Sequence, residues 1–209
     1  MKLRLIKSKT ITMHAKCIGL HALVIAAATL DLAAQAPVAI QIPSSFAMPA
    51  GSVNTNKSGF LVRPYQTSAT HAGSLAWTED QLAGLHGANI ADLSGADTNG
   101  YYPVSTIVNW NIAPGGTVDT FPGADAFPGI GADTTVNFSE EVITYLEFPA
   151  VGTYTMGVNS DDGFGVAVSS LNPKDTFSAL PLGQLNGTRG AADTTFQISV
   201  SQAGIYPFR

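Results

Sequence analysis

The chain has 209 residues, of which 45% are hydrophobic and only 12% charged, and its formal net charge is −5. Nucleic acids and anionic membrane surfaces both attract clustered Lys and Arg, so an acidic balance argues against either as a partner. The length is sufficient for one packed hydrophobic core. Composition therefore favours a globular protein whose surface could attract cations.

The first 36 residues have the pattern of a signal peptide. A head with five basic and no acidic residues precedes an apolar stretch from Ile18 to Leu30. Ala34-Gln35-Ala36 then provides the small residues that signal peptidase requires, so we predict cleavage after Ala36. The apolar stretch, about thirteen residues, is shorter than the roughly twenty that span a bilayer. We expect a secreted protein (extracellular, periplasmic or on the cell surface); the alternative is a buried N-terminal helix or membrane anchor.

Cleavage would change both the thiol content and the charge of the chain. Cys17, the only cysteine, lies within the predicted signal, so residues 37–209 have no disulfide and depend on a packed core. These 173 residues carry five basic and fourteen acidic side chains, a formal net charge of −9. They contain no second hydrophobic span, and we expect no membrane span after cleavage.

The remaining sequence favours β structure. Turn signals built from Gly, Pro and Asn recur throughout it. Apolar and polar residues alternate in Tyr154–Val158, Phe164–Val168 and Phe196–Val200. Successive side chains of a strand point to opposite faces of a sheet, so these runs predict half-buried antiparallel strands. The fold class that we predict is mainly β, an antiparallel β-sandwich.

One short helix is predicted near residues 78–86. Thr78 has the properties of an N-cap, and Gln81 stands at the capping-box position three residues later. Leu82 and Leu85 would pack this helix against the edge of a sheet.

The chain divides into three regions. Residues 1–36 form the signal peptide, and 37–135 form the loop-rich N-terminal part of the β domain, with the short helix. Residues 136–209 form its strand-dense core. A stretch rich in Pro and Gly, from Ala113 to Asp133, separates the last two regions. It is as consistent with a long loop inside one sandwich as with a linker between domains.

Two stretches resemble the protective-antigen (PA-14) domain family. Tyr145–Val168 has the order of that family's signature hairpin: an aromatic-led strand, a Gly152-Thr153-Tyr154 turn, a strand, then Ser-Asp-Asp-Gly and another strand. Ala203–Arg209 resembles a later strand of the family. The general character of the chain is that of secreted bacterial proteins that carry such domains.

The resemblance implies a β-sandwich with a binding or adhesive role. In the lectin members, two consecutive aspartates joined by a cis peptide bond hold a Ca²⁺ that binds sugar hydroxyls. The matching residues here are Asp161 and Asp162. Ca²⁺ takes six to eight oxygen ligands, and this pair supplies at most four. Asn159, Asn186 and Asp193 are near enough in sequence to be considered as further ligands.

The same four residues, 160–163, also make good turn chemistry without any metal. An aspartate can cap the backbone of the turn, and Gly163 can adopt the positive φ that some turns require. Both interpretations remain open at this stage, and Ca²⁺ is the only cofactor that the sequence suggests.

Enzymatic function has little support in the sequence. Glu140 and Glu141 are adjacent acids, but neighbours on a strand face opposite ways and cannot flank one bond. We expect both to be solvated charges. Outside the predicted signal only two histidines remain, His71 and His86, and neither has a partner at metal-ligand spacing. We expect no catalysis unless a catalytic domain lies beyond Arg209.

Arg209 stands in the middle of an alternating strand, so we expect the C-terminal strand to be truncated and the chain to be a fragment. The leading function hypothesis is a secreted, non-catalytic module that binds carbohydrate or a cell-surface or matrix component. The alternatives are a structural or adhesive surface domain without a sugar site, and a targeting module of a larger secreted glycosidase. Phe164, the aromatic residue nearest to Asp161 and Asp162, is expected to face inward.

Overall fold

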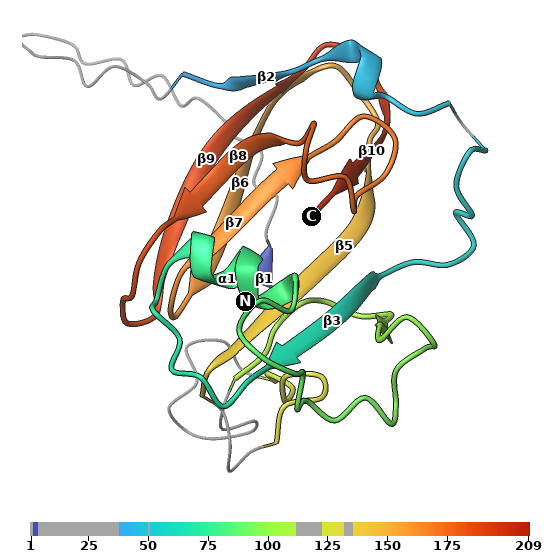
Figure 1. The fold of residues 1–209 in the computed structure, drawn as a ribbon. Coiled ribbons are helices and arrows are strands. Elements are labelled where there is room, and N and C mark those ends of the chain that lie inside the picture. Colours follow the sequence, from blue (N-terminus) through green and yellow to red (C-terminus); the bar gives the residue numbers. More distant parts are fainter. Residues whose placement is uncertain (1, 4–37, 50, 112–122, 132–135) are drawn as a thin grey trace, which may run out of the picture.

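A computed structural model describes residues 2–3, 38–49, 51–111, 123–131 and 136–209. The predicted signal peptide lies outside these ranges, except for the short strand at residues 2–3. The fold is mainly β, as predicted, with two sheets and one α-helix (Figure 1). The elements in chain order are β1 (Lys2–Leu3), β2 (Ile40–Ile42), the 3-10 helix η1 (Ser44–Phe46), β3 (Phe60–Gln66), α1 (Leu75–Leu82), β4 (Tyr102–Val104), β5 (Phe138–Phe148), β6 (Gly152–Ser160), β7 (Phe164–Val168), β8 (Leu180–Leu185), β9 (Ala192–Val200) and β10 (Gly204–Phe208).

The two sheets pack as a sandwich. One has four strands in the order β1-β6-β9-β2, and the other has six in the order β4-β3-β5-β10-β7-β8. All pairs are antiparallel except β2 with β9, which is parallel. Strand β3, from the loop-rich part of the sequence, pairs along β5. That part and the strand-dense part therefore share one sheet.

The main core lies between the sheets, and it contains the alternating residues that the sequence singled out. Met156, Val158, Ile198 and Val200 of the four-stranded sheet are each at most 1% exposed. Across from them lie large side chains of the six-stranded sheet, namely Phe148, Phe164, Val166, Val168, Leu182, Tyr206 and Phe208. Burying aromatic and aliphatic surface of this extent is the main favourable contribution to folding.

A second, smaller core lies at the β3–β4 end. It is built from Val62, Val108 and Trp110, with partly buried neighbours such as Phe127 and Val142. Residues that follow β4 therefore cover the end of the sheet where β5 begins.

Among the described residues, no helix is long and apolar enough to cross a membrane.

The predicted helix exists, but its position differs. It runs from Leu75 to Leu82, and its N-cap is Ser74, whose hydroxyl accepts a hydrogen bond from the Trp77 amide at 3.2 Å. The expected N-cap, Thr78, lies inside the helix, where no capping box operates. Leu82 is buried as expected, whereas Leu85 lies beyond the helix and is 71% exposed. The error arose because Ser74 has no Glu or Gln three residues later to mark it.

Helix α1 lies against the six-stranded sheet, where it contacts β5 and β3 (Figure 1). Gln81 is fully buried there: it accepts a hydrogen bond from Ser139 at 2.7 Å and donates to the Asn137 carbonyl, also at 2.7 Å. The helix thus covers the face of β5 that is opposite to the main core.

Candidate functional site

Asp161 and Asp162 form the exposed connection between β6 and β7. Strand β6 ends at Ser160 and strand β7 begins at Phe164, and the two strands belong to different sheets. The two acids therefore lie on a turn that crosses from one sheet to the other, and not on the hairpin that the family resemblance implied. The peptide bond between the two aspartates is cis. This is the form that the family resemblance implied for this position.

The β8–β9 loop, residues 186–191, packs on this turn. A side chain at Gly163 would come within 2.8 Å of the Leu185 carbonyl oxygen and 2.9 Å of that of Gly187. Glycine is therefore needed at position 163 for this close approach. The sequence-based reason was wrong, because Gly163 is not among the residues with positive φ.

Arg189 links the β8–β9 loop to the residues on both sides of Asp161. Its backbone amide donates to the Asp162 carboxylate at 3.1 Å. Its guanidinium donates to the Ser160 carbonyl at 3.1 Å and to the Ser160 hydroxyl at 2.8 Å. It also donates to the Thr194 hydroxyl at 2.8 Å and the Ala192 carbonyl at 2.7 Å. Four of the five guanidinium N–H groups are thus used on one small area.

The acids at this end of the sandwich carry no cationic partner within the described part of the chain. None of the ion pairs there includes Asp161, Asp162 or Asp193. Although Arg189 is close, its guanidinium bonds only to neutral oxygens. Two adjacent carboxylates therefore remain exposed on a turn that is held by other atoms.

Asn159 and Asp193 lie side by side on neighbouring strands. They are a register pair of β6 and β9, and the Asn159 amide donates to the Asp193 carboxylate at 2.8 Å. Asp193 is the second residue of β9. Asn159 lies directly before Ser160 at the end of β6, and Asp193 follows the β8–β9 loop. The side chains of these two residues bond to each other.

Asn186 is joined to the segment that leads into α1. Its side-chain oxygen accepts a hydrogen bond from the Leu75 amide at 2.9 Å, at the first residue of the helix. Nearby, a side chain at Gly73 would come within 2.6 Å of the Thr188 methyl group. The β8–β9 loop is thus held between the acid turn on one side and residues 73–75 on the other.

Two histidines that are distant in sequence meet at a tryptophan. The His86 ring stacks on Trp77 with centroids 3.5 Å apart, and the His71 ring meets the same indole edge-on at 6.0 Å. Neither contact was predicted, since only the position of α1 brings these rings together. Burial lowers the pKa of His71, although the nearby Asp162 charge opposes this change.

The His71 ring is oriented by local bonds. Its Nδ1 accepts from the Gly73 amide at 2.9 Å, so the proton of the neutral ring lies on Nε2, which is 3.2 Å from the Thr78 hydroxyl. Ser139 is 3.5 Å from the same nitrogen but donates its own proton to Gln81. This geometry does not activate Ser139 as a nucleophile, because a base must accept the hydroxyl proton.

Glu140 and Glu141 point to opposite faces of β5, as expected, but neither is a solvated charge. Glu141 is 6% exposed and receives hydrogen bonds from Arg63 and Arg209, each at 2.9 Å, and from the Tyr101 hydroxyl at 2.6 Å. Both carboxylate oxygens of Glu140 are buried, and neither has a hydrogen-bond partner among the residues that the structure describes. Tertiary contacts over both faces of β5 overturn the sequence-based expectation.

The carboxylates at the turn fit a hard cation in donor chemistry. Ca²⁺ prefers carboxylate and carbonyl oxygens and accepts water to complete its shell. Asp161 and Asp162 would be the residues that hold the ion, and bound Ca²⁺ would supply coordination sites for neutral hydroxyl groups. Within the described residues, no group of three or more His, Cys, Asp or Glu side chains is placed to hold a metal. Neutral oxygens and water would therefore complete the shell.

The chain matches no protein-family model, no curated protein and no solved structure.

Proposed function

We propose that this chain is a secreted, non-catalytic module that binds glycans or surface polymers through Ca²⁺ at Asp161 and Asp162. The observation that carries this proposal is the exposure of two adjacent carboxylates that have no cationic partner in the described structure, on a turn that Arg189 holds in place.

A turn by itself does not require two neighbouring charges. Like charges on neighbouring exposed residues repel each other weakly, because solvent screens most of the effect. The hydrogen bond from the Arg189 amide to Asp162 could be accepted equally well by an uncharged Asn. The turn therefore does not need a negative charge on Asp161 or on Asp162, whereas a bound divalent cation would be stabilised by both charges.

The decisive test is a calcium titration followed by thermal unfolding of the full chain. We expect millimolar Ca²⁺ to raise the melting temperature of the wild type, because a ligand that binds only the folded state stabilises it. The double variant Asp161→Asn/Asp162→Asn should show no such shift. A glycan array probed with and without EDTA then tests whether sugar binding depends on the metal.

A matched control separates site binding from a general effect of charge. The variant Asp125→Asn/Glu147→Gln also removes two negative charges, but from exposed positions outside the turn. It should keep the rise in melting temperature that Ca²⁺ causes. An unchanged melting temperature of the wild type at every calcium concentration would refute the metal-dependent form of the proposal. Glycan binding that persists in EDTA would leave a metal-independent lectin.

Export is part of the proposal. N-terminal sequencing of the secreted protein should begin at Pro37, since we predict cleavage after Ala36. A protein that retains residues 1–36 and stays with the membrane fraction would contradict secretion.

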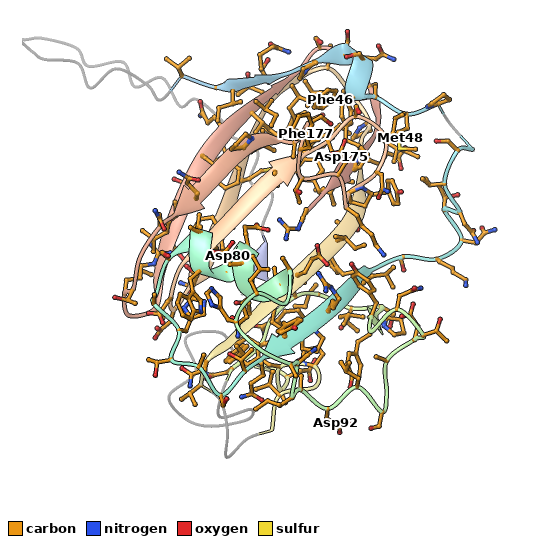
Figure 2. The ribbon with its side chains drawn as sticks, in the orientation of Figure 1. Phe46, Met48, Asp80, Asp92, Asp175 and Phe177 are labelled. Atoms are coloured by element: carbon orange, nitrogen blue, oxygen red, sulfur yellow. The ribbon has the colours of Figure 1, made fainter. Side chains whose placement is uncertain are left out.

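A second candidate is an adhesive surface domain without a sugar site. The β7–β8 loop exposes Phe177 completely and Leu171 to 71%, at the end of β7 opposite to the acid turn. Figure 2 shows Phe177 beside Asp175 in this loop, and Asp175 accepts a hydrogen bond from the Phe177 amide at 3.0 Å. Meanwhile Phe164, next to the acids, is only 5% exposed and cannot stack on a sugar.

This alternative makes a different prediction. Phe177→Ser should abolish adsorption to a matrix-coated surface and leave the calcium shift intact. If Asp161→Asn/Asp162→Asn abolishes adsorption and Phe177→Ser does not, the binding site is the acid turn.

A further inference from the structure

We propose that Arg189 is the positioning residue of the Asp161–Asp162 site, and that its guanidinium sets the affinity of the site for Ca²⁺ by geometry and not by charge. This inference rests on the proposed function. It names a residue outside the acid pair that the resemblance did not indicate.

Arg189 bonds to groups on both sides of Asp161, but its guanidinium forms no hydrogen bond with the Asp161 or Asp162 carboxylate in the described part of the chain. The guanidinium holds both the carbonyl and the hydroxyl of Ser160, the residue directly before Asp161. The backbone amide of the same arginine holds the carboxylate of Asp162. One residue of the β8–β9 loop thus fixes the chain on both sides of Asp161.

The guanidinium is itself fixed. It bonds to Ala192 and Thr194 at the beginning of β9, and its central carbon lies 6.0 Å from the centroid of the Phe164 ring. Phe164 is buried at the start of β7. Because the planar fork of arginine reaches several acceptors in a fixed geometry, it connects the ends of β6, β7 and β9 at one point.

The acids stay available because the acceptors of the fork are all neutral. A guanidinium that paired with Asp161 or Asp162 would compete directly with a metal ion, and no such ion pair exists within the described residues. The remaining effect of the positive charge is a long-range repulsion of Ca²⁺. Positioning and repulsion predict opposite results when Arg189 is replaced, and so they can be distinguished.

The experiment is a Ca²⁺ titration by calorimetry on the full chain, with the melting temperature in EDTA as a second measurement. Arg189→Lys keeps the charge but not the fork, and we expect its dissociation constant to rise by about tenfold, as is usual when a residue that orients a metal ligand is lost. Arg189→Met removes both the charge and the fork, and it should bind Ca²⁺ at least as weakly as Arg189→Lys. Arg63→Lys is the matched control, since it removes a guanidinium elsewhere, one that bonds to Glu141 and to the Leu82 carbonyl. It should lower the melting temperature but keep the dissociation constant.

Single acceptors provide smaller steps in case the arginine variants fold poorly. Ser160→Ala and Thr194→Val each remove one hydroxyl that accepts from the guanidinium, and each should weaken Ca²⁺ binding by roughly two- to fivefold, within the usual energy of one hydrogen bond.

The outcomes separate the two proposals. An unchanged dissociation constant in Arg189→Lys, or tighter binding in Arg189→Met, would overturn the positioning role and leave the calcium site in place. Equal weakening in Arg63→Lys would also overturn it, because the effect would then be general loosening. Absence of Ca²⁺ binding by the wild type would overturn the calcium site and this inference together.

Discussion

The charged groups around Glu141 and those at the Asp161–Asp162 turn are arranged in opposite ways. Glu141 is buried and accepts hydrogen bonds from two arginines and a tyrosine. Burial alone would raise the pKa of Glu141, but Tyr101, Arg63 and Arg209 together hold it below its usual value. The acids of the turn are exposed, and the guanidinium of Arg189 bonds to other groups.

This difference shows which charges serve the fold. A buried carboxylate must be paired, since an uncompensated charge in the protein interior costs several kcal/mol. Arg209 extends the pairing to α1, because its guanidinium also makes two hydrogen bonds to Glu79, at 2.6 and 2.8 Å. The Glu141 cluster therefore joins the helix to the sheet. The acids of the turn form no ion pair within the described residues, and Asp162 accepts a hydrogen bond from the Arg189 amide.

The largest expected effect comes from breaking the Glu141 cluster. Glu141→Gln should lower the free energy of unfolding by about 3–5 kcal/mol, because it leaves Arg63 without its carboxylate and Arg209 with Glu79 alone. Urea unfolding monitored by circular dichroism measures this loss. Glu147→Gln on the same strand, which is exposed, should change stability by less than about 0.5 kcal/mol. Equal effects of the two substitutions would contradict the structural role of the cluster.

Glu140, which neighbours Glu141 on β5, should destabilise the folded chain at neutral pH, so its replacement should raise the free energy of unfolding. Burial raises the pKa of Glu140 to about 9 from a usual value of 4.5. Between these values the folded chain keeps a proton that the unfolded chain releases, so the free energy of unfolding falls as the pH rises. Glu140→Gln should match the wild type near pH 4.5 and exceed it by about 4–5 kcal/mol at pH 8.

Urea titrations at several pH values from 4.5 to 8 would measure this divergence. Parallel pH profiles for Glu140→Gln and the wild type would show that the Glu140 carboxyl is hydrated in the folded protein, and the contrast between the two adjacent glutamates would then disappear.

Helix α1 lies between the two regions and links them, through Glu79 to Arg209 and through Leu75 to Asn186. Ser74→Ala removes its N-cap and should cost about 1 kcal/mol. Thr78→Ala should cost less, because alanine is the better helix former at an interior position. Thermal unfolding of both variants would decide between the two starts of the helix. A larger loss for Thr78→Ala would support the start expected from sequence alone.

The smallest effect is expected at the acid turn. Without Ca²⁺, Asp161→Asn/Asp162→Asn should stay within about 0.5 kcal/mol of the wild type, because Asn can still accept the hydrogen bond from Arg189 and exposed charges contribute little. Urea unfolding in EDTA tests this. A loss comparable with that of Glu141→Gln would mean that the two charged regions are both structural.

Much of the fold could be predicted because it depends on local patterns. The alternation in Tyr154–Val158, Phe164–Val168 and Phe196–Val200 corresponds to buried core faces in the structure. That a helix exists was predictable as well, although its start was not. Ser74, the observed N-cap, has no Glu or Gln three residues later, so the sequence shows no capping box there. Thr78 has Gln81 at that spacing, and it was therefore predicted as the N-cap.

The candidate site was predictable only in its centre. Asp161 and Asp162 are visible in the sequence as an acid pair at the end of an alternating strand, and the structure places them on an exposed turn. Arg189 gave no signal, since an isolated arginine in a Gly-rich loop has many explanations. Its contact with Ser160 crosses 29 residues, and no local pattern encodes a contact of that range.

The sequence by itself determined strands β6, β7 and β9, the pattern of inward and outward side chains along them, and the position of the acid pair at a turn, because these depend on residues a few positions apart. Only the tertiary structure decided which charges are paired. Glu141 meets Arg63 and Arg209 across 78 and 68 residues, while the buried carboxylate of its neighbour Glu140 has no hydrogen-bond partner within the described ranges. Adjacent residues of a strand face different surroundings, and the packing of distant elements determines what those surroundings contain.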